Sequence, residues 1–196
     1  MDNKRNKKFL LGIKGKIGAG KTESAKILKK HFPSMEYAMA DPIKQIGRIL
    51  GFSDEELYGT QKQKLQKNKY WGISSREFLQ TFGTEVCRNF LPTVIPQMNN
   101  IWVRNFEIFC QKNQGNNIIV SDVRFLDEAA SIKKLGGIII EVQRPDLKSA
   151  DVLSHNIHQS ETEQDQIESD YLIMNNSTIK HLQEELIKVV NQHLLG

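Results

Sequence analysis

The stretch Gly15-Lys16-Ile17-Gly18-Ala19-Gly20-Lys21-Thr22 decides the fold that we expect for this chain. It matches the pattern G-x-x-x-x-G-K-[ST], in which a glycine-rich turn aims backbone N–H groups at phosphate oxygens. An apolar run at 9–13 predicts a buried strand before the turn, and the pattern at 22–32 predicts a helix after it. We therefore expect residues 15–22 to bind a chain of phosphates, with Lys21 neutralising its charge and Thr22 ligating Mg²⁺.

Strand and helix patterns alternate along the rest of the chain. Apolar runs predict further strands at 35–40, 118–122, 138–142 and 171–174, and apolar residues with helical spacing predict helices between them. This alternation favours helices on both faces of a mostly parallel sheet. The sequence therefore predicts an α/β protein with the three-layer α/β/α P-loop NTPase fold and five strands. We expect one domain over residues 1–196, with a short lid at about 144–160.

Short polar motifs predict where several helices begin. Asp41 before Pro42 predicts a cap followed by a helix, and capping-box patterns predict helix starts at Ser53 and at Ser74, the latter helix running to about residue 88. Ser160 and Ser177 are predicted to cap the last two helices.

Composition narrows the class of protein. Of the 196 residues, 39% are hydrophobic and 26% are charged, which excludes a disordered chain. The formal charge of +4 suggests an anionic ligand, and no apolar run approaches the roughly 20 residues of a membrane helix. Two cysteines, Cys87 and Cys110, form neither a disulfide framework nor a zinc site by themselves. We therefore expect a soluble cytoplasmic protein.

A carboxylate on the metal side of the site is expected at Asp122. It follows the apolar residues 118–120 at the carboxyl end of a predicted strand, where ligands gather in open α/β sheets. There it would hold Mg²⁺ directly or through water. A helix cap or a turn is the alternative role.

Arginine placement indicates which group accepts the phosphoryl group. A nucleotide kinase must hold two polyanions, and the planar guanidinium group pairs with phosphate through two hydrogen bonds. One face of the helix that begins near Ser75 carries polar side chains at i+4 steps: Arg76, Gln80, Thr84 and Arg88. The opposite face carries Phe78, Phe82 and Val86. The polar face could bind a phosphate and a base edge, or it could simply be solvated.

Two more arginines and two tryptophans complete the candidates. Arg124 lies two residues after Asp122, and Arg144 follows the next predicted strand, so either could stabilise charge on the phosphoryl group. Trp102 and Trp71 could stack on a base, with core packing as the alternative for Trp102.

Together these residues resemble the deoxynucleoside monophosphate kinases of phages and large DNA viruses, which are P-loop kinases related in fold to dephospho-coenzyme A kinase and adenylate kinase. The resemblance covers residues 13–186. It rests on 15–22, Ala40-Asp41-Pro42-Ile43-Lys44, Arg76-Glu77-Phe78-Leu79-Gln80-Thr81-Phe82-Gly83 with Glu85 and Arg88, and Asp122-Val123-Arg124-Phe125 with Glu128. The later His158-Gln159-Ser160-Glu161 and residues 170–176 are similar too. One departure is Thr22-Glu23, where many phage members have Asp-Thr.

The resemblance implies ATP- and Mg²⁺-dependent phosphorylation of a deoxynucleoside monophosphate to its diphosphate. ATP would bind residues 15–22, with Asn176 near the adenine. Lys21, Arg124 and Arg144 would be catalytic, and Thr22 and Asp122 would hold the metal. The candidate residues of the monophosphate site are Asp41, Lys44, Arg76, Gln80, Gly83, Arg88, Trp102, Asp122, Arg124 and Glu128.

Other functions stay open at this point. A P-loop kinase could act on dephospho-coenzyme A or another small metabolite, and a P-loop ATPase could bind nucleic acid through the Lys- and Gln-rich residues 61–69. A non-catalytic nucleotide-binding subunit is a third possibility. We expect nucleotides as partners, with no nucleic acid and no membrane. Kinases of the resembled family are often dimers, and residues 99–110 could form such an interface.

Overall fold

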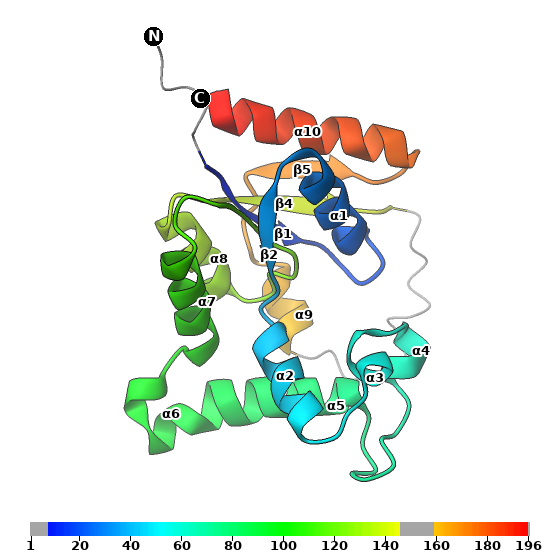
Figure 1. Ribbon diagram of the computed structural model, residues 1–196, viewed down its shortest axis with the longest axis vertical. Coiled ribbons are helices and arrows are strands. Elements are labelled where there is room, and N and C mark those ends of the chain that lie inside the picture. Colours follow the sequence, from blue (N-terminus) through cyan, green and yellow to red (C-terminus); the bar gives the residue numbers. More distant parts are fainter. Residues whose placement is uncertain (1–7, 146–158, 196) are drawn as a thin grey trace. The chain divides into compact units, whose positions relative to one another are not determined.

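The computed structural model describes residues 8–145 and 159–195 (Figure 1). The chain divides into two compact units, one of which contains the residues up to 38 and from 107 onward, and the other residues 39–106. The chain passes from one unit to the other after residue 38 and again after residue 106, and the second of these boundaries falls inside helix α7 (Ile101–Lys112).

The first unit is built on a five-stranded sheet. Its strands are β1 (Leu10–Lys14), β2 (Ser34–Tyr37), β3 (Asn117–Val120), β4 (Ile138–Gln143) and β5 (Tyr171–Met174). They lie in the order β2-β3-β1-β4-β5, and all four neighbouring pairs are parallel. The central strand β1 pairs Gly12 with Val120 on one side and with Ile139 on the other.

Helices cover both faces of this sheet. Alternate residues of β1, Leu11 and Ile13, are fully buried in a core with residues of α1 (Lys21–His31) and α10 (Ile179–Leu195). On the other face, Ile132 of α8 (Leu126–Lys134) lies beside Ile139. The unit also contains the short helix α9 (Gln159–Gln164). Figure 1 shows α10 beside β5. The predicted three-layer α/β fold is therefore confirmed.

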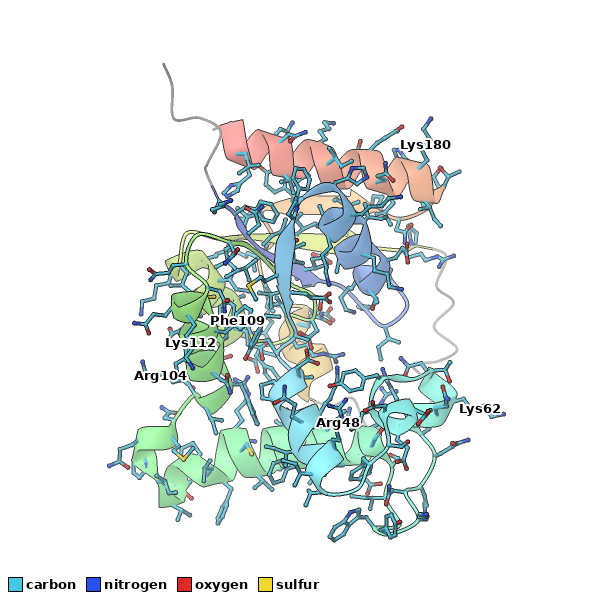
Figure 2. All side chains as sticks on the ribbon, in the orientation of Figure 1. Arg48, Lys62, Arg104, Phe109, Lys112 and Lys180 are labelled. Carbon is cyan, nitrogen blue, oxygen red and sulfur yellow. The ribbon has the colours of Figure 1, made fainter. Side chains whose placement is uncertain are left out.

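The carboxyl half of α7 belongs to this unit. Phe109, labelled in Figure 2, packs its ring against Tyr37 of β2 with 4.8 Å between ring centroids. The Glu107 carboxylate accepts a hydrogen bond from the Ser131 hydroxyl of α8 at 3.3 Å.

The second unit consists mainly of helices. These are α2 (Asp41–Ile49), α3 (Asp54–Tyr58), α4 (Gln61–Lys64), α5 (Ser75–Gln80), the π-helix η2 (Thr81–Phe90), α6 (Leu91–Val94), the 3₁₀-helix η3 (Pro96–Met98) and the first half of α7. Several of their buried side chains form a cluster, against which the partly buried Phe82 packs. Phe52, Phe78 and Phe82 are stacked in series at 5.0 and 5.3 Å between centroids.

Some of the predicted helix starts are wrong. Asp41 is the first residue of α2 rather than its cap, and Ala40, which precedes it, makes no side-chain cap. The hydroxyl of Thr178, not of Ser177, accepts the hydrogen bond from the His181 N–H at the start of α10. Helix α9 begins at Gln159, before Ser160.

Other helix starts agree with the prediction. Ser53 forms a complete capping box with Glu56, and Ser74 accepts a hydrogen bond from the Glu77 N–H. The Lys- and Gln-rich residues 61–69 include the short helix α4, which begins with a capping box at Thr60 that the sequence analysis did not predict. Figure 2 labels Lys62 on this helix.

The long helix that begins at Ser75 changes its winding partway. After Gln80 it continues as the π-helix η2, in which hydrogen bonds join residues i and i+5. Steps of four residues then no longer complete a turn, so the two faces drawn from i+4 spacing fail at Thr84 and Val86, although Phe82 packs as predicted. Val86, expected to pack, is 38% exposed, and Thr84, expected on the polar face, is only 5% exposed.

Two further sequence predictions concern the lid and membrane-spanning helices. Most of the predicted lid, residues 146–158 with His158, lies outside the described residues. Among the helices that the structure describes, none is long and apolar enough to cross a membrane.

Candidate active site

The loop between β1 and α1 has a positive φ at three glycines, and two of these also lie close to other segments. Gly15 and Gly20 have φ angles of 149° and 110°, which side chains rarely adopt. A Cβ atom on Gly15 would lie 2.3 Å from the Val142 carbonyl oxygen, and one on Gly20 would lie 2.5 Å from Nδ2 of Asn175. The glycine spacing of the motif therefore follows from how closely β4 and the residues after β5 approach the loop.

The amino end of α1 has the features that an anion site requires, as the motif predicts. Its first residue is Lys21, and Gly20 before it provides no side-chain cap. The first N–H groups of a helix have no partner within the helix, and the helix dipole favours negative charge there. The Lys21 ammonium group donates hydrogen bonds to the carbonyl oxygens of Gly15 and, at 3.0 Å, of Lys16. The loop thus holds the Lys21 ammonium group against its own carbonyl oxygens.

The two predicted metal ligands, Thr22 and Asp122, come after the paired strands β1 and β3 along the chain. Thr22 is exposed in the first turn of α1, and the partly buried Asp122 follows β3, which pairs with β1. Hydroxyl and carboxylate oxygens are hard donors that suit Mg²⁺, which usually keeps several waters and takes few protein ligands. No group of three or more His, Cys, Asp or Glu side chains that could hold a metal occurs among the described residues. This donor set fits Mg²⁺ and does not fit a metal that needs a full protein cage.

Glu128 holds the backbone around Arg124. It is 2% exposed, and its carboxylate accepts hydrogen bonds from the N–H groups of Arg124 at 2.9 Å and Phe125 at 3.2 Å. Predicted as a substrate contact, Glu128 is instead buried against the backbone, which makes it a residue that positions Arg124. Arg124 itself is partly buried, next to Asp122 along the chain.

In the second unit, α2 brings together two of the predicted substrate residues. The Lys44 ammonium group lies 3.2 Å from Oδ1 of Asp41 and 4.6 Å from the centroid of the Tyr58 ring. Arg48, labelled in Figure 2, extends from the same helix to Asp54, with 2.6 Å between Nη2 and Oδ1. Asp54 raises the pKa of Arg48 by its hydrogen bond and its charge.

Trp102 is part of the core of the second unit. It is 5% exposed, and its indole N–H donates to the carbonyl oxygen of Gly83 at 2.9 Å. A ring buried in this way has no face for a base, so the stacking role predicted for Trp102 does not suit its position. Gly83 is also buried, and a Cβ atom there would lie 2.6 Å from Cδ1 of Ile43. Both residues therefore pack η2 within its own unit.

The remaining predicted residues differ in exposure. Arg76, Gln80 and Arg88 are partly buried along α5 and η2. Arg144 and Asn176 are exposed, the first just after β4 and the second two residues after β5.

Asn175, the neighbour of Asn176, contacts residues 15–22, which we call the phosphate loop. The sequence did not indicate this contact. Nδ2 of Asn175 donates to the carbonyl oxygen of Ala19 at 2.9 Å. The Asn175 N–H donates to the Gln143 carbonyl at 2.7 Å, which extends the pairing of β5 with β4. The turn after β5 is thereby fastened to the loop.

A buried ion pair at the end of β1 was also missed. The Lys14 ammonium group, directly before the loop, lies 3.0 Å from Oε2 of Glu141 in β4, and the side chains are 5% and 21% exposed. Burial raises the pKa of Glu141, but hydrogen bonds from Gln143 and Lys14, the charge of Lys14 and a hydrogen bond from Ser169 outweigh it and lower this pKa. A lysine that ends an apolar strand pattern was the available signal, because such a charge must find a partner when buried.

Comparisons with known proteins agree with this fold. Shikimate kinase from Aquifex aeolicus is 11% identical with a TM-score of 0.51, over 96% of this chain and 99% of that one. The protein TT1252 from Thermus thermophilus is 16% identical with a TM-score of 0.53, over 94% of this chain and 97% of that one. These likenesses show that the chain shares its α/β fold with a kinase.

The sequence comparisons identify the family within this class. The family profile described as deoxynucleotide monophosphate kinase matches residues 48–186. A protein of Acanthamoeba polyphaga mimivirus assigned as a deoxynucleotide monophosphate kinase is 36% identical over 190 residues, which cover 93% of this chain and 96% of that protein. The chain belongs to the deoxynucleotide monophosphate kinase family. The resemblance inferred from the motifs is confirmed, and so is the kinase activity that it implies.

Proposed function

We propose that this kinase transfers the γ-phosphoryl group of ATP, with Mg²⁺, to a deoxynucleoside monophosphate. The observation that carries the choice of donor is the uncapped amino end of α1 beside the Lys21 ammonium group. Such a site suits the adjacent phosphates of a nucleoside triphosphate, because N–H groups and one cation can share their charge.

On the donor side, residues 15–22 enclose the phosphates and Lys21 neutralises the outer ones. Thr22 and Asp122 would hold Mg²⁺, which supplies charge neutralisation on the transferring group. Asn176, exposed two residues after β5, would lie near the adenine.

On the acceptor side, the second unit supplies the residues that recognise the monophosphate. These are Asp41, Lys44, Arg76, Gln80 and Arg88, of which the arginines suit the phosphate group. Because a monophosphate is already ionised, no strong base is needed. Arg124 and Arg144 would stabilise charge on the transferring phosphoryl group, with residues 144–160 as the lid of a single kinase domain. The homodimer stays a prediction, which light scattering would test.

The test is an assay of ADP release with each dNMP, each NMP, dephospho-coenzyme A and single-stranded DNA. We expect release with at least one dNMP, abolished in Lys21→Ala, and a raised KM for the monophosphate in Arg88→Ala. The exposed Lys26 and Arg104 provide matched controls as Lys26→Ala and Arg104→Ala, which should leave activity unchanged. Release with dephospho-coenzyme A alone, or with DNA alone, would replace this proposal with one of the alternative functions.

A further inference from the structure

The side chain of Gln164 connects two segments of the candidate site. Gln164 ends α9 and is 5% exposed. Its Nε2 group donates to the carbonyl oxygen of Gly15 at 3.2 Å and to that of Val123 at 3.1 Å. Gly15 begins the phosphate loop, and Val123 lies between Asp122 and Arg124. One amide group therefore ties the loop to the segment that carries the predicted metal carboxylate.

The Gly15 carbonyl oxygen accepts from a second side chain as well. The Lys21 ammonium group donates to the same oxygen. The proposed function requires Lys21 to reach the nucleotide phosphates, and a lysine that does so gives up contacts with the loop carbonyls. Gln164 is then the side-chain donor that remains on Gly15. A buried carbonyl that loses its donor is costly, and Gly15 is buried.

We propose that Gln164 is a positioning residue for nucleotide binding: its amide keeps the Gly15 carbonyl hydrogen-bonded when Lys21 moves to the phosphates. This inference rests on the proposed function, because it takes Lys21 to be a phosphate ligand.

The surroundings of Gln164 hold it in place for this role. The Lys14 ammonium group donates to the carbonyl oxygens of Gln164, at 3.4 Å, and of Ile167. The neighbouring Glu163 carboxylate accepts from the Leu126 N–H at 3.0 Å, at the start of α8. Both contacts fasten α9 to the sheet unit without using the Gln164 amide, so the amide can be removed while its support remains.

The test is a double-mutant cycle with Gln164→Met and Lys21→Met. Methionine has a similar length and no donor. Affinity for a non-hydrolysable imido analogue of ATP, with Mg²⁺, would be measured by calorimetry, with a displacement titration for weak binding. In the wild-type background we expect Gln164→Met to weaken binding about tenfold. In the Lys21→Met background the loss should vanish, because no donor leaves Gly15 on binding.

Further measurements separate this role from a merely structural one. Gln164→Met should raise the KM for ATP and leave the KM for the monophosphate unchanged. The exposed Gln166 gives the matched control Gln166→Met, with no change expected. If Gln164→Met does not fold, Gln164→Asn replaces it, because asparagine keeps an amide that is one methylene short. Gln164→Asn should weaken binding of the analogue by a smaller factor when Lys21 is present, and it should have no effect in the Lys21→Met background.

The outcomes distinguish this inference from the proposed function. Equal losses of affinity in both backgrounds, or no loss in either, would overturn the role of Gln164 while ATP-dependent kinase activity persists. Failure of the wild-type protein to bind the analogue would overturn the proposed function and this inference with it.

Discussion

Replacing Lys14 by methionine tests whether the buried ion pair stabilises the end of β1. The change removes the partner of Glu141 and the donor to the carbonyl oxygens of Gln164 and Ile167. Removing one member of a buried pair costs about 3–5 kcal/mol, because the other charge stays buried. Glu141 is 21% exposed and keeps a hydrogen bond from Gln143 at 2.7 Å, so we place the cost at about 2–3 kcal/mol.

The assay is thermal unfolding followed by calorimetry at neutral pH. For a chain of this size, about 1 kcal/mol shifts Tm by about 2–4 °C, so Lys14→Met should lower Tm by about 4–12 °C. The control is Lys29→Met, because Lys29 and Glu36 form a pair of similar length, 2.9 Å, with side chains 42% and 33% exposed. Surface pairs contribute at most about 1 kcal/mol, so this control should shift Tm far less.

The double variant Lys14→Met/Glu141→Gln sharpens the test. It removes both charges, so it should recover part of the Tm that the single change loses. Equal shifts for Lys14→Met and Lys29→Met would refute the reasoning, because burial is the property that distinguishes the two pairs.

Three other predictions concern separate parts of the first unit. Glu141 has a pKa below its ordinary value of 4.5. Its stabilising contribution is therefore present above that pH and is lost as the pH falls through the lowered pKa. The Tm difference between wild type and Glu141→Gln, measured from pH 7 to pH 3, should shrink only in acid. Gly15→Ala should weaken nucleotide binding at least about tenfold in calorimetry, because the added Cβ would lie 2.3 Å from a carbonyl oxygen. The control is Gly115→Ala, because Gly115 also has a positive φ but has open space around its Cβ position, and this change should leave binding intact. Burial and the charge of Glu107 raise the pKa of Cys110 to about 11, so iodoacetamide at pH 8 should label it roughly a hundredfold more slowly than a free thiol, and rapid labelling in mass spectrometry would contradict this burial.

The sheet and the phosphate loop could be predicted from the sequence because their signals are local. A strand buried on both faces is a short apolar run, and the run at 171–174 coincides with β5 residue for residue. The glycines and the lysine of the loop occupy fixed positions because the loop backbone requires them. These elements combine short-range patterns with burial, and both are visible in the order of residues.

The features that escaped prediction depend on contacts between distant residues. The amide of Gln164 binds Gly15 and Val123, which are 149 and 41 positions away, and nothing near Gln164 in the sequence indicates these partners. The π-helix η2 has no local signature in the residues 81–90, so the faces assigned by i+4 spacing failed at Thr84 and Val86. Trp102 shows the same limit, because an aromatic residue suits a core and a ligand site equally well until its burial is known.

The order of strands in the sheet has a consequence for synthesis of the chain. β1 lies between β3 and β4, which begin at Asn117 and Ile138, more than a hundred residues further along. At ribosomal rates of about 5–20 residues per second, β1 waits roughly 5–20 s for its first neighbour. During that interval the residues 39–106, which form their own unit, are already complete. An apolar strand with two open edges is prone to pair with other chains, so the segment that carries the phosphate loop is the one that a cell must protect while the polypeptide grows.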